Sequence, residues 1–377
     1  MLTLEILLFD DSCMRGLLPA ISKCATTVCS WMRQGRLVVI RFNDDCDGIT
    51  SGMAVYVASK SYAEKIPKTR HAIEGYQVPS AIYKASDAFD DVSRARSAGL
   101  GLGVIIVDLG ANKESVEGLR ALKDSCAGVC IIDHHPPDEA ALSLCDAFVS
   151  SHSFDPTGAH TTGLLSFEVA ERIAPGAANK QWAFWSLQSD KSTLATGEKF
   201  DGAEALDYLA HFSEKSTSIE FYLEKVADSK TVELAAALSR KSGQKAFNAA
   251  LKYSVEKQVA DSFVLVVVDL SRAVRKGAYP PKGRCLNLVQ DHFCLKHKDS
   301  AVICLGHSSD SISIRANAAA LEKGFHSNPL IDRLKAEFPH AVTSGGGHAG
   351  AASIRFDPQF KESVLSRLVE IICEGVN

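Results

Sequence analysis

The 377-residue sequence lacks any long uninterrupted apolar run and any excess of basic residues. A transmembrane helix needs roughly 20 consecutive apolar residues, so the first absence argues against a helical membrane span. Lys and Arg total 41 against 45 Asp and Glu, which gives a formal net charge of −4. Proteins that bind nucleic acid broadly usually present a basic face. The second absence therefore argues against a general polyanion binder, although a local basic groove stays compatible with the sequence.

The cysteines lack the spacing of a redox or zinc motif. Eleven are present, none forms a CxxC pair, and several lie in apolar segments, as Cys130 and Cys304 do. Such cysteines are typical of reduced, buried thiols in a cytosolic protein. Residues 1–10 contain two acids and no basic residue, which does not fit a secretory signal peptide. We therefore predict a cytoplasmic protein.

Length and composition predict a globular protein of two domains, and the alternation of strand and helix patterns predicts an α/β fold. Hydrophobic residues make up 46% of the chain and charged residues 23%, as in globular proteins, and the length exceeds one typical core. We predict a helical lead-in over residues 1–35, a domain with a parallel sheet over 36–199, a helical connector over 200–258, and a smaller α/β domain over 259–377. The connector is Ala-rich and polar and shows no strand pattern.

Apolar strands in the first domain end repeatedly at acidic residues. Residues 37–40, 104–107 and 128–132 form such strands, and they lead to Asp45 and Asp47, to Asp108, and to Asp133, His134 and His135. Continuous apolar strands that alternate with helical stretches indicate a parallel sheet. In such sheets, ligands bind at the carboxyl ends of the strands. We therefore expect these side chains to meet at one edge.

Residues 133–135, Asp-His-His, are the most informative of these, because the strand before them ends abruptly and Pro136 follows. Carboxylate oxygen combined with imidazole nitrogen suits Mn²⁺, Fe²⁺ or Zn²⁺ better than Ca²⁺. Each feature alone has a plainer explanation, since Asp45 and Asp47 could form an acidic surface turn. Their combination predicts a metal site. We expect His160, in a later loop, to be exposed to solvent.

The second domain offers groups that could bind an anion. Strands are predicted over 263–268, 301–305, 311–315 and 351–356. Ser344–Gly350 contains three consecutive glycines, so we predict a flexible loop whose backbone N–H groups can approach an anion closely. Arg315 ends a strand and carries a forked donor that matches phosphate. The plainer alternatives are a simple connection and a surface charge.

The order of these motifs resembles the DHH phosphoesterase superfamily with a C-terminal DHHA1 domain. The motifs are Asp45-x-Asp47-Gly48, the strand-end Asp108, Asp133-His134-His135, and Gly345-Gly346-Gly347-His348. That superfamily includes RecJ-type single-strand exonucleases, nanoRNases that degrade very short oligonucleotides, and phosphatases of 3′-phosphorylated adenosine nucleotides. The resemblance covers about residues 36–195 and 260–356. It implies a DHH catalytic domain, a DHHA1 substrate-binding domain, and an active site in the cleft between them.

The resemblance also implies a role for each residue. The implied metal ligands are Asp45, Asp47, Asp108, His134 and Asp190, and Asp190 is assigned by the family pattern alone. Asp108 would bridge two ions, His135 would contact the substrate phosphate or act as an acid, and Asp133 would orient a ligand. The implied substrate-binding residues are Arg315, Gly345, Gly346, Gly347 and His348.

One part of the motif departs from the family. Relatives carry a His or Asp just before the Asp-x-Asp pair, where it serves the first metal site, whereas the candidate positions here hold Arg41 and Asn43. Arginine cannot ligate a cation, and an Asn carbonyl is a weak ligand for a transition metal. We predict a weakened first metal site and leave three outcomes open: an ion that loads with substrate, a single tightly held ion, or lost activity.

We expect a divalent-metal-dependent hydrolase that cleaves phosphodiester bonds of short oligonucleotides or of single-stranded ends, as an exonuclease or nanoRNase does. The ion would be Mn²⁺ or Mg²⁺, present as one ion or two, and it would lower the pKa of the attacking water. The alternatives are a nucleotide phosphatase of the pAp type and a weakened scaffold that binds nucleic acid or protein. The sequence does not distinguish RNA from DNA as the substrate, and it predicts neither the polarity of cleavage nor the oligomeric state.

Overall fold

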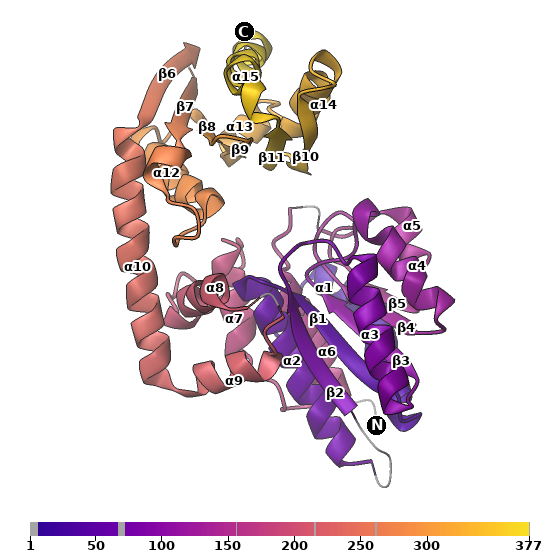
Figure 1. The fold of residues 1–377 in the computed structure, drawn as a ribbon. Coiled ribbons are helices and arrows are strands. Elements are labelled where there is room, and N and C mark those ends of the chain that lie inside the picture. Colours follow the sequence, from indigo (N-terminus) through magenta and orange to yellow (C-terminus); the bar gives the residue numbers. More distant parts are fainter. Residues whose placement is uncertain (1–6, 67–71, 156, 215, 261, 377) are drawn as a thin grey trace. The chain divides into compact units, whose positions relative to one another are not determined.

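The computed structural model describes residues 7–66, 72–155, 157–214, 216–260 and 262–376, and Figure 1 shows its ribbon. The chain consists of two compact units, Met1–Ala237 and Leu238–Asn377. Each unit contains a β-sheet covered by helices, so the predicted α/β fold class is confirmed. Within the described residues, no helix combines the length and apolar character that crossing a membrane requires.

The first unit is built on a parallel five-stranded sheet with the strand order β2-β1-β3-β4-β5. Its strands are β1 (Leu37–Asn43), β2 (Ala72–Val78), β3 (Leu102–Val107), β4 (Gly128–Ile132) and β5 (Ala147–Val149). β3 and β4 are buried along their whole length, as expected of central parallel strands. The strand order reverses between β1 and β3, and ligands in such sheets bind at this switch point.

Helices cover both faces of this sheet (Figure 1). One face packs against α1 (Ser12–Arg33), α2 (Cys46–Glu64) and α6 (Thr162–Ile173), and α7 (Gln181–Ser189) packs on α2 and α6. The other face packs against α3 (Ala85–Ala98) and α4 (Val116–Asp124). Side chains alternate along β1 accordingly, since Ile40 and Phe42 join the first cluster whereas Leu37 and Val39 join the second. Because both faces of β1 are covered, residues 37–40 are all apolar.

Strand β2 was not predicted from the sequence. It lies at the edge of the sheet beside β1, and its sequence, Ala-Ile-Glu-Gly-Tyr-Gln-Val, is interrupted by polar residues and a glycine. A Cβ at Gly75 would lie 2.9 Å from Ile219 of α9 (Ile219–Ala227). The glycine therefore lets the helix pack closely on the edge strand, and this packing leaves no apolar pattern in the sequence.

The second unit contains a mixed six-stranded sheet in the order β10-β11-β9-β8-β7-β6. Its strands are β6 (Ser254–Ala260), β7 (Phe263–Asp269), β8 (Ala301–His307), β9 (Ser311–Ala316), β10 (Val342–His348) and β11 (Ala351–Phe356). One face packs against α12 (Lys282–Lys296) and α10 (Ser229–Lys252). The other packs against α14 (Ser327–Glu337) and α15 (Lys361–Val376).

Two expectations for this part of the chain were wrong. The predicted glycine loop is strand β10, which pairs antiparallel with β11. Three consecutive glycines suggested a loop because glycine weakens strands, but here the backbone hydrogen bonds to β11 hold them extended. The region 200–258, predicted as a helical connector, holds α8 (Asp201–Phe212), α9 and α10, but its last residues belong to β6. That strand is polar and exposed, so it lacks an apolar pattern.

Arg41 has a structural role that the sequence did not reveal. Its guanidinium group donates to both carboxylate oxygens of Asp91 on α3 at 2.5–3.1 Å, and both side chains are buried. The hydroxyl of Tyr83 donates to Asp91 Oδ2 at 2.8 Å. Arg41 therefore belongs to a buried ion pair between β1 and α3. Arg41 and Asn43 are the two positions that depart from the family pattern. Of these two residues, only Asn43 faces the carboxylates of Asp45 and Asp108.

We expect Asp91→Ala to lower the free energy of unfolding by about 3–5 kcal/mol, because it leaves a buried guanidinium group without its charge partner. Denaturant unfolding followed by circular dichroism measures the change. The matched control is Asp90→Ala on the same helix, where the side chain is exposed and the expected change is within about 0.5 kcal/mol. Equal effects of the two substitutions would contradict a structural role for the ion pair.

Candidate metal centre

Asp47 is fixed in the first turn of α2 by the start of another helix. The backbone N–H of Thr162 donates to its Oδ2 at 3.0 Å, and that of Gly163 donates to its Oδ1 at 2.6 Å. Ser186 on α7 donates to the same Oδ1 from its hydroxyl at 2.6 Å. The N-terminus of α6 favours a negative charge at this place. Asp47 is only 1% exposed, so these donors hold it as an oriented carboxylate.

The three donors to Asp47 were not identified from the sequence. A Cβ at Gly163 would lie 2.5 Å from the Cβ of Ser186, so the approach of α6 to α7 requires glycine at this position. Thr161 is the N-cap residue of α6, and a threonine N-cap followed by an apolar helix is a pattern visible in the sequence. That pattern predicts the helix start, but it does not say which carboxylate the helix start would bind.

Asp108 leaves the end of β3 with a positive φ of 60°, in the left-handed region that aspartate adopts more readily than most residues. Its backbone N–H donates to the carbonyl oxygen of Ile132 on β4 at 3.0 Å. Its Oδ1 accepts from the hydroxyl of Thr162 at 3.1 Å. The same helix start therefore positions both Asp47 and Asp108.

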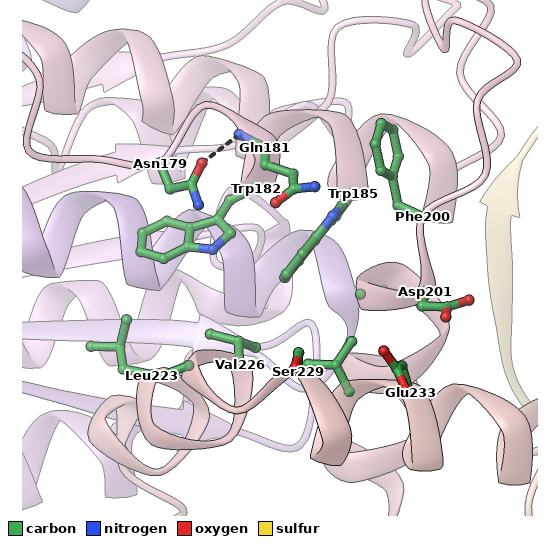
Figure 2. A pocket seen from close by; sticks show the side chains of 13 residues that line it. Asn179, Gln181, Trp182, Trp185, Phe200, Asp201, Leu223, Val226, Ser229 and Glu233 are labelled. Atoms are coloured by element: carbon green, nitrogen blue, oxygen red, sulfur yellow. Dashed lines mark hydrogen bonds between the residues drawn. The ribbon is translucent and has the colours of Figure 1, made fainter.

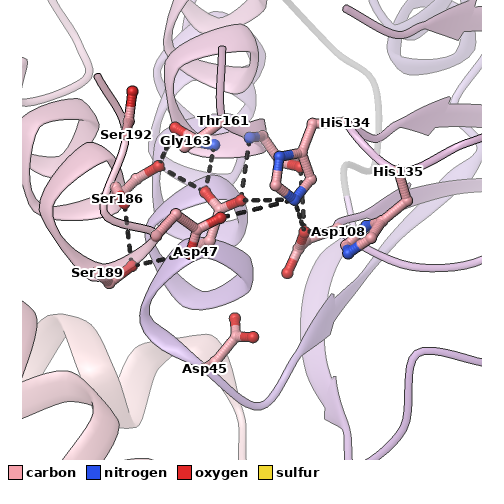
Figure 3. A network of polar contacts seen from close by, with 12 residues as sticks. Asp45, Asp47, Asp108, His134, His135, Thr161, Gly163, Ser186, Ser189 and Ser192 are labelled. Atoms are coloured by element: carbon pink, nitrogen blue, oxygen red, sulfur yellow. Dashed lines mark hydrogen bonds and ion pairs between the residues drawn. The ribbon is translucent and has the colours of Figure 1, made fainter. Parts of the chain in front are cut away.

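Three carboxylates surround one nitrogen of His134. The Nε2 atom lies 3.9 Å from Asp47 Oδ2, 3.7 Å from Asp108 Oδ1 and 3.6 Å from Asp190 Oδ2. These distances exceed those of hydrogen bonds. Ligand atoms that each lie about 2.1 Å from one ion are about 3.0–3.4 Å apart, so a modest contraction of each contact would let that carboxylate share a cation with His134. Figure 3 shows Asp47, Asp108 and His134 pointing toward one another.

The electrostatics of this cluster also favour a cation. Burial, and after it repulsion from Asp45 and Asp47, raises the pKa of Asp108 well above its usual range. Burial and then Asp47 and Asp45 do the same to the pKa of Asp190, which is the C-cap residue of α7. Carboxylates crowded in a buried site are stabilised by a nearby positive charge. The donor set and its electrostatics therefore both fit a divalent metal ion.

Asp133 orients His135, the third residue of the motif. Oδ1 of Asp133 lies 2.8 Å from Nδ1 of His135 and accepts from the backbone N–H of His135 at 3.0 Å. Burial alone would lower the pKa of His135, but the carboxylate of Asp133 outweighs it and raises that pKa to about 9. The His135 side chain is 37% exposed and its Nδ1 lies 3.8 Å from Asp108 Oδ1. His135 is thus held at the solvent-facing side of the cluster.

Asp45 does not face His134, as Figure 3 shows. Asp45 is the N-cap residue of α2, and its Oδ1 accepts from the backbone N–H of Gly48 at 2.9 Å. In the described part of the chain, the groups of three ligand-type side chains are Asp47-His134-Asp190, Asp108-His134-His135 and Asp11-Cys13-His160. The predicted ligands Asp47, Asp108, His134 and Asp190 thus come together, whereas Asp45 belongs to none of these groups.

The predicted substrate-binding residues lie in the second unit. Gly345, Gly346 and Gly347 are in β10, where His348 ends the strand and its side chain lies outside the described part of the structure. Arg315 on β9 pairs with Ala351 on β11, and Ala351 pairs with His348. Arg315 and His348 therefore occupy one row across the sheet.

His160 was predicted to be exposed, and this was wrong, because only 6% of it is exposed. Its Nε2 lies 2.8 Å from Asp11 Oδ2, and its Nδ1 lies 2.8 Å from Asp155 Oδ2. Both ring nitrogens are thus occupied by carboxylates that belong to the protein. The group Asp11-Cys13-His160 is explained as a link between the start of α1 and the loop before α6.

A cavity of about 450 Å³ lies elsewhere in the first unit, among α7, α8, α9 and the start of α10. Figure 2 shows the indoles of Trp182 and Trp185 on one side and the aliphatic side chains of Leu223 and Val226 on the other. None of the predicted metal ligands lines this cavity. We therefore place the chemistry at the cluster around His134, where the donor atoms for a metal ion converge.

Comparison with known proteins agrees with this geometry, because residues 37–184 match the N-terminal domain of the DHH family. This match confirms the predicted resemblance to the DHH phosphoesterase superfamily over that part of the chain. An uncharacterized protein of Methanocaldococcus jannaschii is 24% identical to the chain over 97% of the chain's length. The chain spans about half, 55%, of the length of that relative.

Solved structures share the fold of this chain. A DHH domain described as a member of the S1p family of ribosomal proteins has a TM-score of 0.89 at 23% identity, over 98% of this chain and 93% of that one. The exonuclease RecJ bound to manganese has a TM-score of 0.59 at 12% identity, over 93% of each chain. An exopolyphosphatase-related protein from Bacteroides fragilis has a TM-score of 0.53 at 16% identity, over 94% and 97%.

We expect Ser186→Ala to weaken Mn²⁺ binding about 10- to 100-fold, because groups that orient metal ligands contribute this much to affinity. Isothermal titration calorimetry with Mn²⁺ measures the affinity. The matched control is Ser166→Ala on α6, since Ser166 is also buried and its hydroxyl has no hydrogen-bond partner among the described residues. Equal Mn²⁺ affinities in the two variants would show that the hydrogen bond from Ser186 to Asp47 does not support a metal site.

Proposed function

We propose that the protein is a divalent-metal-dependent phosphoesterase that hydrolyses phosphodiester bonds at the ends of short oligonucleotides. The observation that carries this proposal is the convergence of Asp47, Asp108 and Asp190 on His134 Nε2 at 3.6–3.9 Å. These distances are too long for hydrogen bonds, and a modest contraction would bring them to the separation of ligands that share an ion. A combination of carboxylate and imidazole ligands favours Mn²⁺, with Mg²⁺ as the alternative.

In this proposal Asp47, Asp108, His134 and Asp190 hold the ion. When bound, a divalent cation supplies Lewis acidity, which lowers the pKa of the attacking water and offsets the negative charge that develops on the phosphate. Asp47 is kept in place by the start of α6 and by Ser186. These donors come from the backbone and from buried side chains, so the ligand geometry is set before substrate arrives.

His135 is the residue proposed to contact the substrate. Asp133 holds its Nδ1, so the opposite edge of the ring is directed away from Asp133. From that edge an imidazolium can donate to a phosphate oxygen and can pass a proton to the leaving oxygen. The His135 side chain is partly exposed and lies beside Asp108. A residue that contacts the substrate next to the ion needs such a position.

The second unit supports an oligonucleotide in preference to a mononucleotide. Along β9, buried Ile312 and Ile314 alternate with Ser311, Ser313 and Arg315, and along β11 Ser353 and Arg355 are exposed. This face of the sheet presents small polar side chains and two guanidinium groups. Arg315 Nε donates to Asn287 Oδ1 at 2.7 Å, and no carboxylate in the described residues forms an ion pair with Arg315. We propose that Arg315 and the glycines of β10 bind phosphates of the substrate.

The fold shared with an exonuclease that binds manganese is consistent with this ion and this class of substrate. A nucleotide phosphatase of the pAp type binds a substrate with two phosphates, whereas an oligonucleotide carries a phosphate at every linkage along its length. A polar sheet face that carries Arg315 and Arg355 in separate strands offers places for more than one phosphate. This distribution of charge favours the oligonucleotide.

We expect Mn²⁺-dependent release of mononucleotides from di- to pentanucleotides, abolished by a chelator. Asp108→Asn should reduce turnover by at least about 100-fold, because it removes charge at the ion. Asparagine tolerates a positive φ, so the fold should persist. Labelled RNA and DNA oligomers together with pAp distinguish the substrate classes, and Asp90→Asn is the control at an exposed position. Phosphate release from pAp alone would favour the phosphatase, and no metal-dependent turnover of any substrate would overturn the proposal.

A further inference from the structure

The side-chain amide of Asn43 lies between two of the carboxylates implied as metal ligands. Its Nδ2 donates to Asp45 Oδ2 at 3.0 Å and to Asp108 Oδ2 at 3.2 Å. Two carboxylate oxygens that face one point are the usual surroundings of a cation. Here an N–H₂ group, which carries partial positive charge and cannot ligate a metal, occupies that point.

The orientation of this amide is fixed by a third hydrogen bond. Asn43 Oδ1 accepts from the backbone N–H of Asp44 at 3.0 Å. Rotation of the amide by half a turn would break that bond, turn the N–H₂ group toward another donor, and bring Oδ1 against the oxygens of Asp45 and Asp108. All three contacts therefore favour the observed orientation, in which the nitrogen faces the carboxylates.

The carboxylate oxygens on the Asn43 side of the cluster accept hydrogen bonds from the protein, whereas those near His134 Nε2 accept none from that nitrogen. Asp45 receives donors from within the protein on both oxygens, Gly48 N–H on Oδ1 and Asn43 on Oδ2. On the opposite side, His134 Nε2 lies near three carboxylate oxygens without a hydrogen bond to any of them. Asp108 serves both sides, with Oδ2 toward Asn43 and Oδ1 toward His134.

We infer that the Asn43 amide replaces one cation, so that the centre binds a single divalent ion on the side of Asp47, His134 and Asp190. This inference rests on the proposed metal-dependent function. It gives Asp108 one ion and one amide as partners, where two ions would otherwise share it. Asn43 thereby determines how many ions the centre takes.

The inference predicts that Asn43→Asp creates a second metal site. The new carboxylate has almost the shape of the amide and can still accept from the backbone N–H of Asp44. Its other oxygen would take the place of Nδ2, close to Asp45 Oδ2 and Asp108 Oδ2. The separations of 3.0 and 3.2 Å seen for Nδ2 match those of ligands on a shared ion. Three carboxylates at this place would repel one another until a cation binds.

The experiment measures Mn²⁺ stoichiometry of the full chain by isothermal titration calorimetry and by metal analysis after desalting. Electron paramagnetic resonance then distinguishes an isolated Mn²⁺ from a spin-coupled pair. We expect one isolated ion in the wild type, a coupled pair in Asn43→Asp, and no tightly bound ion in His134→Ala. Circular dichroism verifies that each variant is folded.

The possible outcomes separate this inference from the proposed function. Two ions of similar affinity in the wild type would overturn the inference and leave the metal-dependent function intact. No ion in the wild type would overturn both. A single ion in a folded Asn43→Asp variant would show that the amide is not what excludes the second ion. If that variant does not fold, the wild-type stoichiometry still decides.

Discussion

The carboxylate of Asp47, held by the start of α6 and by Ser186, is the constraint on which the centre depends. Through it α2, α6 and α7 meet at one point, and α7 carries Asp190 at its end. The approach requires glycine at position 163, because any Cβ there would collide with Ser186. Because Thr162 also donates to Asp108, one helix start positions two proposed ligands, Asp47 on α2 and Asp108 at the end of β3. Local packing and metal geometry are therefore set by the same contacts.

The sheet supplies the second half of the arrangement. Parallel strands present their carboxyl ends at one edge, and the reversal of strand order between β1 and β3 opens that edge at the place where Asn43, Asp45 and Asp108 emerge. Burial, and after it repulsion between neighbouring carboxylates, raises the pKa of Asp108 and Asp190, so their charged forms are unfavourable in a centre without positive charge. A cation relieves this repulsion, so the same feature that destabilises the isolated site provides its affinity.

The sequence predicted the parts of this centre that depend on strand patterns. β3, β4 and the first four residues of β1 are continuous apolar runs because both faces of the sheet are covered, so Asp108 and His134 could be placed at strand ends without knowledge of the fold. Asp190 could not be found in this way, because a residue at the end of a helix comes near Asp47 only through helix packing. The partners of His160 are 149 and 5 residues away in the chain, and the pairing of β10 with β11 depends on backbone hydrogen bonds. Neither leaves a pattern in the order of residues.

The motif Asp45-x-Asp47-Gly48 shows why the number of bound metal ions cannot be inferred from a ligand motif alone. Asp45 caps α2 through the N–H of Gly48, and a Cβ at Gly48 would lie 2.6 Å from the backbone oxygen of Asn43. Both residues are therefore required by the tight turn from β1 into α2, whether or not an ion binds there. Asp47 is directed by the same turn toward His134. One short segment thus builds the helix start and supplies one proposed metal ligand. The number of ions that we infer depends on Asn43, at a position where the resemblance implies a charged or imidazole ligand.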